Sequence, residues 1–299
     1  MKMRGLSTDA KREEKVVVCA DFDQTISTHD TIYLLFEAAT LRRTNQDDKK
    51  KHQQAVDCLV NQYISEMKQF MATVADLNTE AKVFDREGLE RFLDQFSAVD
   101  MSSIQRVIES RALRGVHETD LLALGAKIEI MDGCLDVLSR AAHVCVVSSN
   151  WSALMIEHKL RTSSETAGCL QHLQIVSNDL DVETTGVTSG SITLRMQSPS
   201  DKATWVRKMQ AQKGRPTVYI GDSTNDLLAL LEADVGIIVT KELRGTLKWV
   251  CQRFGIDVVS ITECGSFQEC TMRANKHTRE NSRMLLFTAS DWSQISNII

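Results

Sequence analysis

The first clear hydrophobic pattern is the apolar run at residues 15–20 (KVVVCA), which the polar segment 21–25 (DFDQT) follows directly. A continuous apolar run of this length is typical of a strand that is buried on both faces of a parallel sheet. Similar runs lie at residues 144–147, 217–220 and 235–239. These segments predict the central strands of such a sheet.

Between Thr31 and about Ile128 the pattern changes, and this stretch contains no proline. Apolar residues recur three and four positions apart, as at Leu89, Phe92 and Leu93, which is the spacing of one helix face. We expect four or so helices here and no strands.

From Gly133 onward, predicted strands and helices alternate, and this order predicts a parallel sheet with helices on its faces. Helices are expected at residues 135–142, from Ala153, at 202–212, from Asp226, at 243–254 and from about Ser290. Further strands are expected at residues 173–176, 191–194 and 257–260. The polar segment 263–283 is expected to be a surface loop.

Composition narrows the function classes. The 299 residues are 42% hydrophobic and 25% charged, as is usual in globular proteins. A chain of this length can bury a core without disulfides or structural metals. The net charge of −5 lacks the basic excess of a nucleic-acid-binding protein, and no apolar run reaches the length of a membrane span. Eight scattered cysteines without a C-x-x-C pair, and a polar N-terminus, indicate a reduced intracellular protein. We expect a cytoplasmic protein without a nucleic-acid or membrane partner.

Aspartates follow two of the predicted strands. Asp21 comes directly after the first strand, where its carboxylate could attack phosphorus, and Asp23 could act as general acid and then base. Asp222 and Asp226 follow the strand at 217–220 and offer the oxygen ligands that Mg²⁺ prefers. An Asp-x-Asp pair alone is also common in turns and helix caps, whereas Gly-Asp-x-x-x-Asp after a buried strand is less so.

Two further features offer groups for an anion. The Ser148 hydroxyl and the Ser149 amide lie at a predicted strand-to-helix turn, where phosphate binds well, although Ser148 is equally suited to cap the helix. Lys202 lies near a helix start, where a positive charge is unfavourable, so it could instead neutralise Asp21 and a phosphate. The alternative is a surface lysine. Because the carboxyl ends of parallel strands share one edge of a sheet, we expect these features to converge.

In this order, DFDQT, VCVVS, SDKATW and GDSTND resemble the four motifs of the haloacid dehalogenase-like hydrolase superfamily. The resemblance extends from about Lys15 to the end of the chain. It implies an α/β fold with a Rossmann-like parallel-sheet core, into which an all-helical cap is inserted. The implied division is an N-terminal tail at 1–14, a core at 15–28 and 129–299, and the cap at 29–128.

The resemblance also implies roles. Asp21 would be the nucleophile and a Mg²⁺ ligand, and Asp23 would give its backbone carbonyl to the metal. Asp222 would be a ligand, supported by Asp226 through bound water. Thr25, in the first motif, is expected to contact the phosphate. A second aspartate in the first motif favours a phosphatase over a dehalogenase.

A narrower resemblance concerns the substrate. SSNWS, YIGDSTNDLLALLEADVGIIV and LLFTASDW look like the thiamine-phosphate phosphatase branch, which implies thiamine monophosphate as the substrate. In the related phosphoserine phosphatases an acidic residue at the place of Asp30 binds an ammonium group, so Asp30 could attract a cation; it could equally cap the helix at 31–40. Trp151 could stack on a substrate ring, although core packing is the simpler interpretation.

The leading hypothesis is therefore a Mg²⁺-dependent phosphomonoesterase for a small phosphorylated metabolite, acting through an aspartyl-phosphate. The alternatives are a phosphoserine-type or other metabolite phosphatase, a phosphotransferase with another acceptor, and a non-catalytic binding protein. The last would be expected to lack Asp21, Asp23 or Asp222, and all three are present.

Overall fold

Seven strands form the main sheet of the protein, a computed structural model that describes residues 15–75, 80–163, 170 and 172–299. The strands are β1 Val17–Ala20, β2 His143–Ser148, β3 Leu173–Ser177, β6 Thr217–Gly221, β7 Val235–Val239, β8 Ile256–Ser260 and β9 Met284–Ala289. Their order is β3-β2-β1-β6-β7-β9-β8, and every neighbouring pair is parallel. The predicted α/β fold with a parallel sheet is confirmed.

The position of β1 creates the crevice that matters for function. The chain passes from β1 to β2 and β3 on one side, and then crosses to β6 on the other side of β1. In open α/β sheets, ligands bind at the carboxyl ends of the strands where the strand order reverses. Asp21 and Asp222 follow β1 and β6, and so lie on either side of this point.

Alternate residues of β1 pack into different layers of the core. Val18 and Ala20 belong to one buried cluster, whereas Val17 and Cys19 belong to the other. This alternation follows from the two-residue period of a strand. Because both faces are covered, β1 has no exposed residue to mark it as amphipathic.

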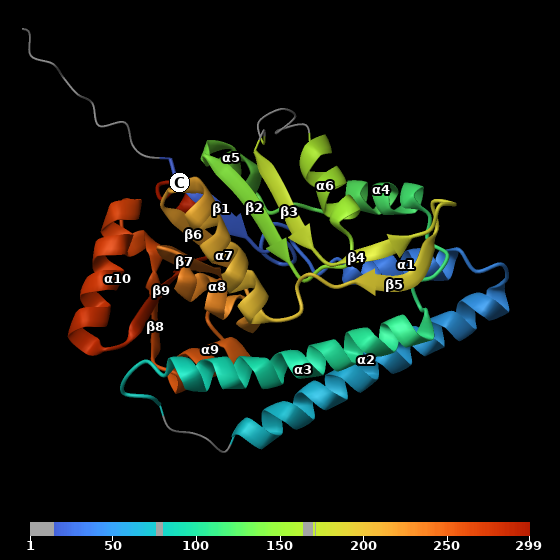
Figure 1. Ribbon diagram of the computed structural model, residues 1–299, viewed down its shortest axis with the longest axis horizontal. Helices are drawn as coiled ribbons and strands as arrows, with labels where there is room; N and C mark the ends of the chain where they lie inside the picture. The colour runs from blue at the N-terminus through green and yellow to red at the C-terminus, as the bar shows by residue number, and fades with distance from the viewer. Residues whose placement is uncertain (1–14, 76–79, 164–169, 171) are drawn as a thin grey trace, which may run out of the picture.

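Helices cover the sheet and extend beyond it (Figure 1). They are α1 Ile32–Leu41, α2 Gln46–Ala75, α3 Arg86–Ser110, α4 Glu118–Lys127, α5 Cys134–Arg140, α6 Ala153–Thr162, α7 Pro199–Lys213, α8 Leu227–Glu232, α9 Gly245–Arg253 and α10 Phe267–Asn281. Short 3-10 turns are η1 Thr224–Asp226, η2 Ile261–Glu263 and η3 Trp292–Ile295. The four helices α1–α4 confirm the predicted helical stretch, while the cap boundaries stay a prediction. Among the described residues, no helix combines the length and apolarity needed to cross a bilayer.

Helices α2 and α3 form a long hairpin that lies along one side of the molecule (Figure 1). Its far end is attached to the core, because the Phe84 amide donates to the Ser282 carbonyl at 2.7 Å and the Asp85 amide to the Phe254 carbonyl at 3.0 Å. Phe92 on α3 also packs against Phe254, with ring centroids 5.7 Å apart. The hairpin is therefore attached to the core at the start of α3, at the opposite end from its connections to α1 and α4.

One small sheet differs from the prediction. Strands β4 Asp179–Val182 and β5 Thr188–Thr193 pair antiparallel and stand apart from the main sheet. The sequence predicted a strand at 191–194 and none at 179–182. The short, exposed and polar β4 carries only one buried residue, Leu180, so it has no hydrophobic run.

The surface loop predicted at 263–283 is wrong, because most of this segment is the helix α10. Only Cys270 of α10 is fully buried, which left little apolar periodicity to detect. The start signal was nevertheless present: the Glu269 amide donates to the Ser266 hydroxyl at 3.3 Å, and the Gly265 amide donates to the Glu269 carboxylate at 2.6 Å. Ser266 is therefore the N-cap of α10, and Glu269 accepts from the amide one residue before that cap.

The end of the chain also differs. The final helix predicted from Ser290 is only the short turn η3, and the apolar run before it is the inner strand β9. Trp292 of η3 is completely buried and donates from Nε1 to the Thr25 carbonyl at 2.9 Å. The C-terminal segment therefore supports the loop that follows β1.

Candidate active site

Asp21 lies at the carboxyl end of β1, where its amide donates to the Ile220 carbonyl of β6 at 2.9 Å. The residue is only 7% exposed, and its Oδ1 lies 3.1 Å from the Lys202 ammonium. Apart from this ion pair, Oδ1 has no hydrogen-bond partner among the described residues. Burial raises the pKa of Asp21 well above its usual value, and Lys202 only partly opposes this.

Lys202 reaches the site from the first turns of α7. The helix begins at Pro199 after the Ser198 cap, and the side chain is almost completely buried between Asp21 and Asp226, whose Oδ1 lies 2.8 Å away. Burial alone would lower the pKa of Lys202, but the two carboxylates outweigh it and raise that pKa above its usual value. The surface-lysine alternative is excluded.

Asp226 is the hub of the loop after β6. Its Oδ1 accepts from Lys202 and from the Tyr219 hydroxyl at 2.8 Å each, and its Oδ2 accepts from the amides of Asp222 and Ser223 and from the Ser223 hydroxyl. Burial opposes ionisation, but Lys202 and these hydrogen bonds prevail and hold the pKa of Asp226 below its usual range. Because both oxygens are engaged, Asp226 is suited to shaping the loop.

Asp222 is the less constrained carboxylate of this loop. The Thr25 hydroxyl donates to its Oδ1 at 3.2 Å, which links the first motif to the fourth. Burial, together with the charge of Asp226, raises the pKa of Asp222 to about 7. Thr25, predicted to contact phosphate, is itself fully buried.

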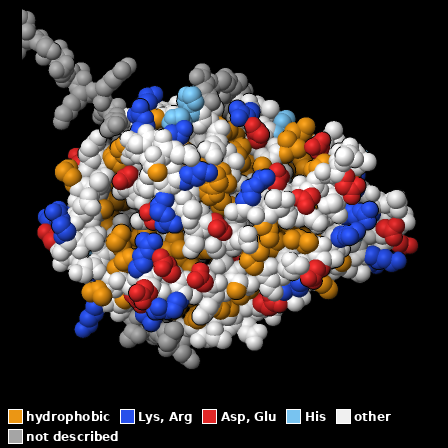
Figure 2. All heavy atoms as spheres, in the orientation of Figure 1, with side chains coloured by type: hydrophobic (Ala, Val, Ile, Leu, Met, Phe, Trp, Pro, Cys, Tyr) orange, Lys and Arg blue, Asp and Glu red, His pale blue; other side chains and the backbone are white. Residues whose placement is uncertain are grey.

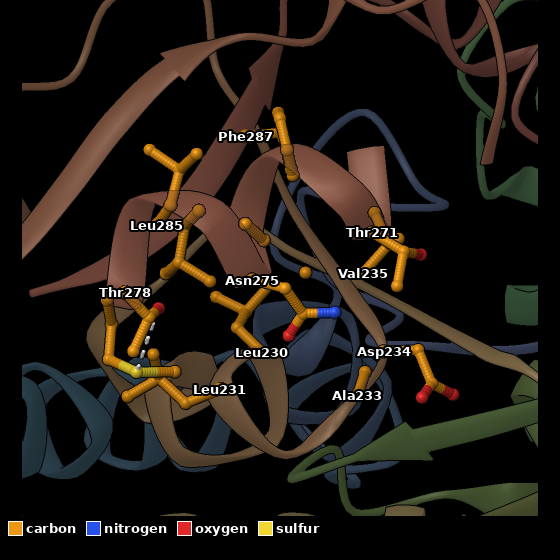
Figure 3. A pocket seen from close by; sticks show the side chains of 14 residues that line it. Leu230, Leu231, Ala233, Asp234, Val235, Thr271, Asn275, Thr278, Leu285 and Phe287 are labelled. Carbon is orange, nitrogen blue, oxygen red and sulfur yellow. Dashed lines mark hydrogen bonds between the residues drawn. The ribbon is translucent and has the colours of Figure 1, made fainter. Parts of the chain in front are cut away.

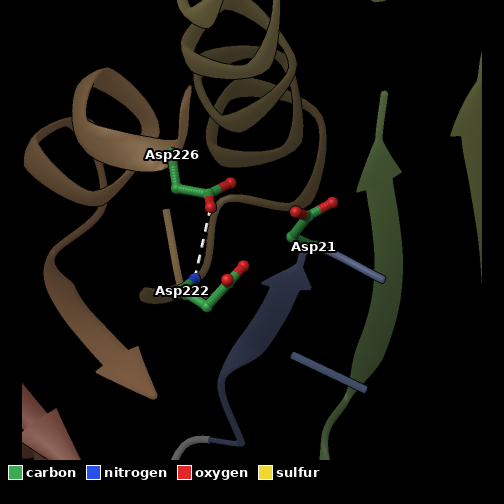
Figure 4. A group of neighbouring side chains, drawn as sticks. All are labelled: Asp21, Asp222 and Asp226. Atoms are coloured by element: carbon green, nitrogen blue, oxygen red, sulfur yellow. Dashed lines mark hydrogen bonds between the residues drawn. The ribbon is translucent and has the colours of Figure 1, made fainter. Parts of the chain in front are cut away.

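The carboxylates of Asp21, Asp222 and Asp226 lie side by side at the ends of β1 and β6 (Figure 4), with one oxygen of each within 4.8 Å of the others. Burial is the main cause of the raised pKa values of Asp21 and Asp222, and repulsion among the three acids adds to it. The buried Oδ1 of Asp21 adds an acceptor without a hydrogen-bonding donor among the described residues. An all-oxygen set of this kind fits a hard divalent cation.

Asp23 points to a different set of partners. Its Oδ1 accepts from the amide and hydroxyl of Thr31 at 2.7 and 2.6 Å, and its Oδ2 accepts from Asn150 Nδ2 at 2.8 Å. Burial raises the pKa of Asp23, although these hydrogen bonds favour its charged form. The Asp23 carboxylate lies outside the three-carboxylate group, so the predicted metal contact through its backbone carbonyl stays a prediction.

The predicted phosphate-binding serines lie at the end of β2, the strand next to β1. The Ser148 hydroxyl is buried and accepts from the Asn150 amide at 3.1 Å, so it does not cap α6; Ser152 does that, by accepting from the Met155 amide. The Ser149 carbonyl accepts from Asn178 Nδ2 at 3.1 Å.

Four residues that support the site were missed in the sequence. They are Asn150, which holds Asp23; Asn178, which holds the loop after β2; Tyr219, which donates to Asp226; and Trp292, which holds the Thr25 carbonyl. Asn150 and Asn178 each follow a predicted strand, and a polar residue there is a signal that could have been used. Tyr219 lies inside an apolar run and gave no such signal.

The two residues predicted to contact the substrate differ in their exposure to solvent. Asp30 is exposed and its Oδ1 accepts from the Ile32 amide, the first amide of α1, at 2.8 Å, whereas the N-cap position of that helix is Thr31. Trp151 is buried and packs edge-on against Phe36, with ring centroids 5.9 Å apart. The structure thus favours the core-packing interpretation of Trp151. The carboxylate of Asp30 is exposed to solvent.

A pocket elsewhere in the molecule contains none of these residues. It lies between α8, α10 and the first halves of β7 and β9, and Leu230, Asp234, Asn275 and Phe287 contribute to its lining (Figure 3). The predicted site residues instead gather at the carboxyl ends of β1, β2 and β6.

The chain is similar to several known proteins. A family model described as haloacid dehalogenase-like hydrolase matches residues 18–231. The chain is 27% identical to the "Bifunctional TH2 protein, mitochondrial" of Arabidopsis thaliana, over 95% of this chain and 49% of that protein, and so spans about half of its length. It is 26% identical to a CTO1 family protein of Schizosaccharomyces pombe, over 92% of this chain and 96% of that one. A solved phosphoserine phosphatase in apo form aligns with a TM-score of 0.48 and 13% identity, over 94% of this chain and 98% of that chain.

Proposed function

Because the chain belongs to the haloacid dehalogenase-like hydrolase family, we propose that it is a Mg²⁺-dependent phosphomonoesterase that uses Asp21 as its nucleophile. The observation that carries the proposal is the buried Asp21 carboxylate. Its Oδ1 lies 3.1 Å from Lys202 and accepts no hydrogen bond from any described residue. A buried carboxylate that faces one ammonium group at the reversal point of the sheet is suited to attack.

The first chemical step forms a bond between an Asp21 oxygen and phosphorus and breaks the bond to the leaving alcohol. Lys202 offsets the charge of Asp21 and of the incoming phosphate. Asp21 and Asp222 would hold Mg²⁺, with Asp226 shaping their loop. When bound, the metal would neutralise the carboxylates and polarise the phosphate.

Asp23 suits the role of general acid and base. Burial raises the pKa of Asp23, which is the direction that a general acid for the departing oxygen requires. The same group, once deprotonated, would take a proton from the water that hydrolyses the aspartyl-phosphate. Asn150 and Thr31 fix its position between the core and the start of α1.

We favour thiamine monophosphate as the substrate, on the resemblance of the loops around the motifs to the thiamine-phosphate phosphatase branch. The exposed carboxylate of Asp30 could attract its thiazolium cation. Basic and acidic side chains are interspersed on the face shown in Figure 2, which suits a small-molecule substrate better than a polyanion. A phosphoserine-type phosphatase and a phosphotransferase remain the competing assignments.

The decisive experiment measures phosphate release from a panel of phosphorylated metabolites with and without Mg²⁺. We expect Asp21→Asn to lower turnover by roughly 1,000-fold or more while the circular dichroism spectrum stays unchanged. Asp94→Asn, at an exposed position on α3, is the matched control and should retain activity. Full activity of Asp21→Asn would refute the mechanism, and phosphate transfer to an added alcohol without free phosphate would favour the phosphotransferase.

The cellular location is part of the same proposal. The scattered cysteines and the composition support the cytoplasm, whereas the name of the Arabidopsis relative mentions mitochondria. Microscopy of the full chain fused at its C-terminus to a fluorescent protein distinguishes the two compartments.

A further inference from the structure

We propose that Asp100 is a positioning residue that couples the α2–α3 hairpin to residues 221–226, here called the metal loop. This inference rests on the proposed function, because the metal loop carries the carboxylates assigned to Mg²⁺. It concerns a residue that lies more than a hundred positions from the loop in sequence and outside all four motifs. The contact between Asp100 and the loop is the observation on which it depends.

Asp100 lies on α3 and uses both of its carboxylate oxygens. Its Oδ2 accepts from Asn225 Nδ2 of the metal loop at 3.1 Å, and its Oδ1 accepts from the Tyr63 hydroxyl of α2 at 2.8 Å. Burial raises the pKa of Asp100, and these two hydrogen bonds oppose the shift. One side chain thus joins both helices of the hairpin to the loop between Asp222 and Asp226.

The contact fixes the orientation of the Asn225 amide. A carboxylate only accepts hydrogen bonds, so Asn225 must turn Nδ2 toward Asp100 and its Oδ1 away from it. That Oδ1 is buried and has no hydrogen-bond partner in the described parts of the chain. An unpaired buried acceptor is costly, so the amide would turn over or the loop would shift if Asp100 did not hold it.

The metal loop is therefore held from two sides. From inside the core, Asp226 accepts from the amides of Asp222 and Ser223. From the hairpin, Asp100 holds Asn225. The inner contacts fix the loop backbone near β6, whereas Asp100 fixes the turn η1 that lies beyond it.

Aromatic side chains pack the hairpin against the core near Asp100. Phe92 and Phe96 of α3 pack on Phe70 of α2, with ring centroids 5.6 and 6.1 Å from it. Phe92 also contacts Trp249 of α9 at 5.5 Å. Since α3 is fixed to the core along this cluster, Asp100 presents its carboxylate from a fixed position.

The test compares Asp100→Ala, Asp100→Asn and the control Asp94→Ala, which changes an exposed aspartate of the same helix. Asparagine can accept from Asn225 and donate to the Tyr63 oxygen, so it should preserve the link that alanine removes. Calorimetric titration of the metal-free protein with Mg²⁺, without substrate, is the first measurement. We expect Asp100→Ala to weaken Mg²⁺ binding about tenfold, whereas Asp100→Asn stays within about threefold of wild type.

Amide hydrogen exchange of the metal-free proteins is the second measurement. In Asp100→Ala, the amides of residues 221–226 should exchange faster than in wild type, with β6 and the control variant unchanged. If Asp100→Ala binds Mg²⁺ like wild type and merely unfolds at a lower temperature, Asp100 only attaches the hairpin and the proposal is wrong. If the wild type neither binds Mg²⁺ nor releases phosphate, the proposed function fails, and unchanged exchange in the metal loop would overturn the role of Asp100 separately.

Discussion

The two sides of the proposed site are built in different ways. On the core side, Asp21, Lys202 and Asp226 are buried, and the lysine ammonium lies 3.1 Å from Asp21 and 2.8 Å from Asp226. On the cap side, Asp30 is exposed and holds the start of α1 through the Ile32 amide. The core side is a connected network of buried charges, whereas Asp30 is a solvated carboxylate outside that network.

This difference indicates which part of the function each side can change. Removing one member of a buried charge network leaves the others unpaired, at a cost of several kcal/mol. Changing an exposed charge costs little stability, because water screens it. We therefore expect the reaction to depend on residues that rely on one another, and the choice of substrate to depend on residues that can vary independently.

The substitution Lys202→Met is expected to have the largest effect, and it tests whether the charges of the core side depend on one another. It leaves the carboxylates of Asp21 and Asp226 buried without their cation, so we expect the free energy of unfolding to fall by about 3–5 kcal/mol and turnover to be lost. Urea denaturation of the metal-free protein measures the first effect. Lys208→Met, an exposed position on the same helix, is the control and should cost less than about 1 kcal/mol.

The opposite result would be informative. If Lys202→Met were as stable as the control, the core side would not be an interlocked network. The distinction from the cap side would then be one of burial alone.

The next prediction concerns pH. In the metal-free protein the pKa of Asp222 is about 7, so below pH 7 this carboxyl group carries a proton that Mg²⁺ must displace. We expect Mg²⁺ affinity to fall by up to about tenfold per pH unit below 7, as calorimetry at several pH values would show. In Asp222→Asn this pH dependence should be much weaker, and an unchanged dependence would assign it to another group.

The same pKa fixes the sign for stability. A carboxyl group whose pKa is raised on folding stabilises the protein at low pH, and this contribution is lost as pH rises through about 7. The metal-free protein should therefore lose part of its stability between about pH 4 and pH 7, and Mg²⁺ should restore it. Thermal unfolding with and without Mg²⁺ at both pH values measures this.

The core side was the part that sequence patterns could predict. Asp21, Ser148 and Asp222 each follow an apolar run, and parallel strands bring such positions to one edge. Their partners could not be predicted in the same way. Tyr219 contacts Asp226 only because of how neighbouring strands and loops fold, which no local pattern records. The position of Asn150 after a strand did not by itself identify Asp23 as its partner.

The fold shows the same limit. Buried strands such as β7 were predicted to the residue, because a continuous apolar run marks both of their ends. Helix α10 was missed, because a helix that buries a single residue has almost no apolar face to detect. Strand β9 is an inner strand with four buried residues, yet no strand was predicted between the segment assigned as a loop and the final helix.

A finer prediction tests the cap side through Asp30→Asn. Asparagine can accept from the Ile32 amide as aspartate does, so the free energy of unfolding should change by less than about 0.5 kcal/mol. If the carboxylate attracts a cationic substrate, KM for thiamine monophosphate should rise about fivefold with kcat unchanged. p-Nitrophenyl phosphate, which has no cationic group, serves as the control; an equal rise in its KM would show that the charge does not select the substrate.

The smallest effect is expected at Gln24. A substitution there tests whether the core side contains an unfavourable backbone conformation as well as buried charges. Gln24 lies between Asp23 and Thr25 with φ of 58°, a left-handed conformation that disfavours residues other than glycine. Gln24→Gly should relieve this strain and, after the extra entropy of glycine in the unfolded chain, stabilise the protein by up to about 1 kcal/mol. Gln24→Ala retains the strain and is the matched control, and urea denaturation of both variants is the measurement. Because the Gln24 side chain is exposed, turnover should stay within about twofold in each. Equal free energies of unfolding for the two variants would mean that the backbone of the loop after β1 is not strained. The core side would then differ from the cap side in its charges alone.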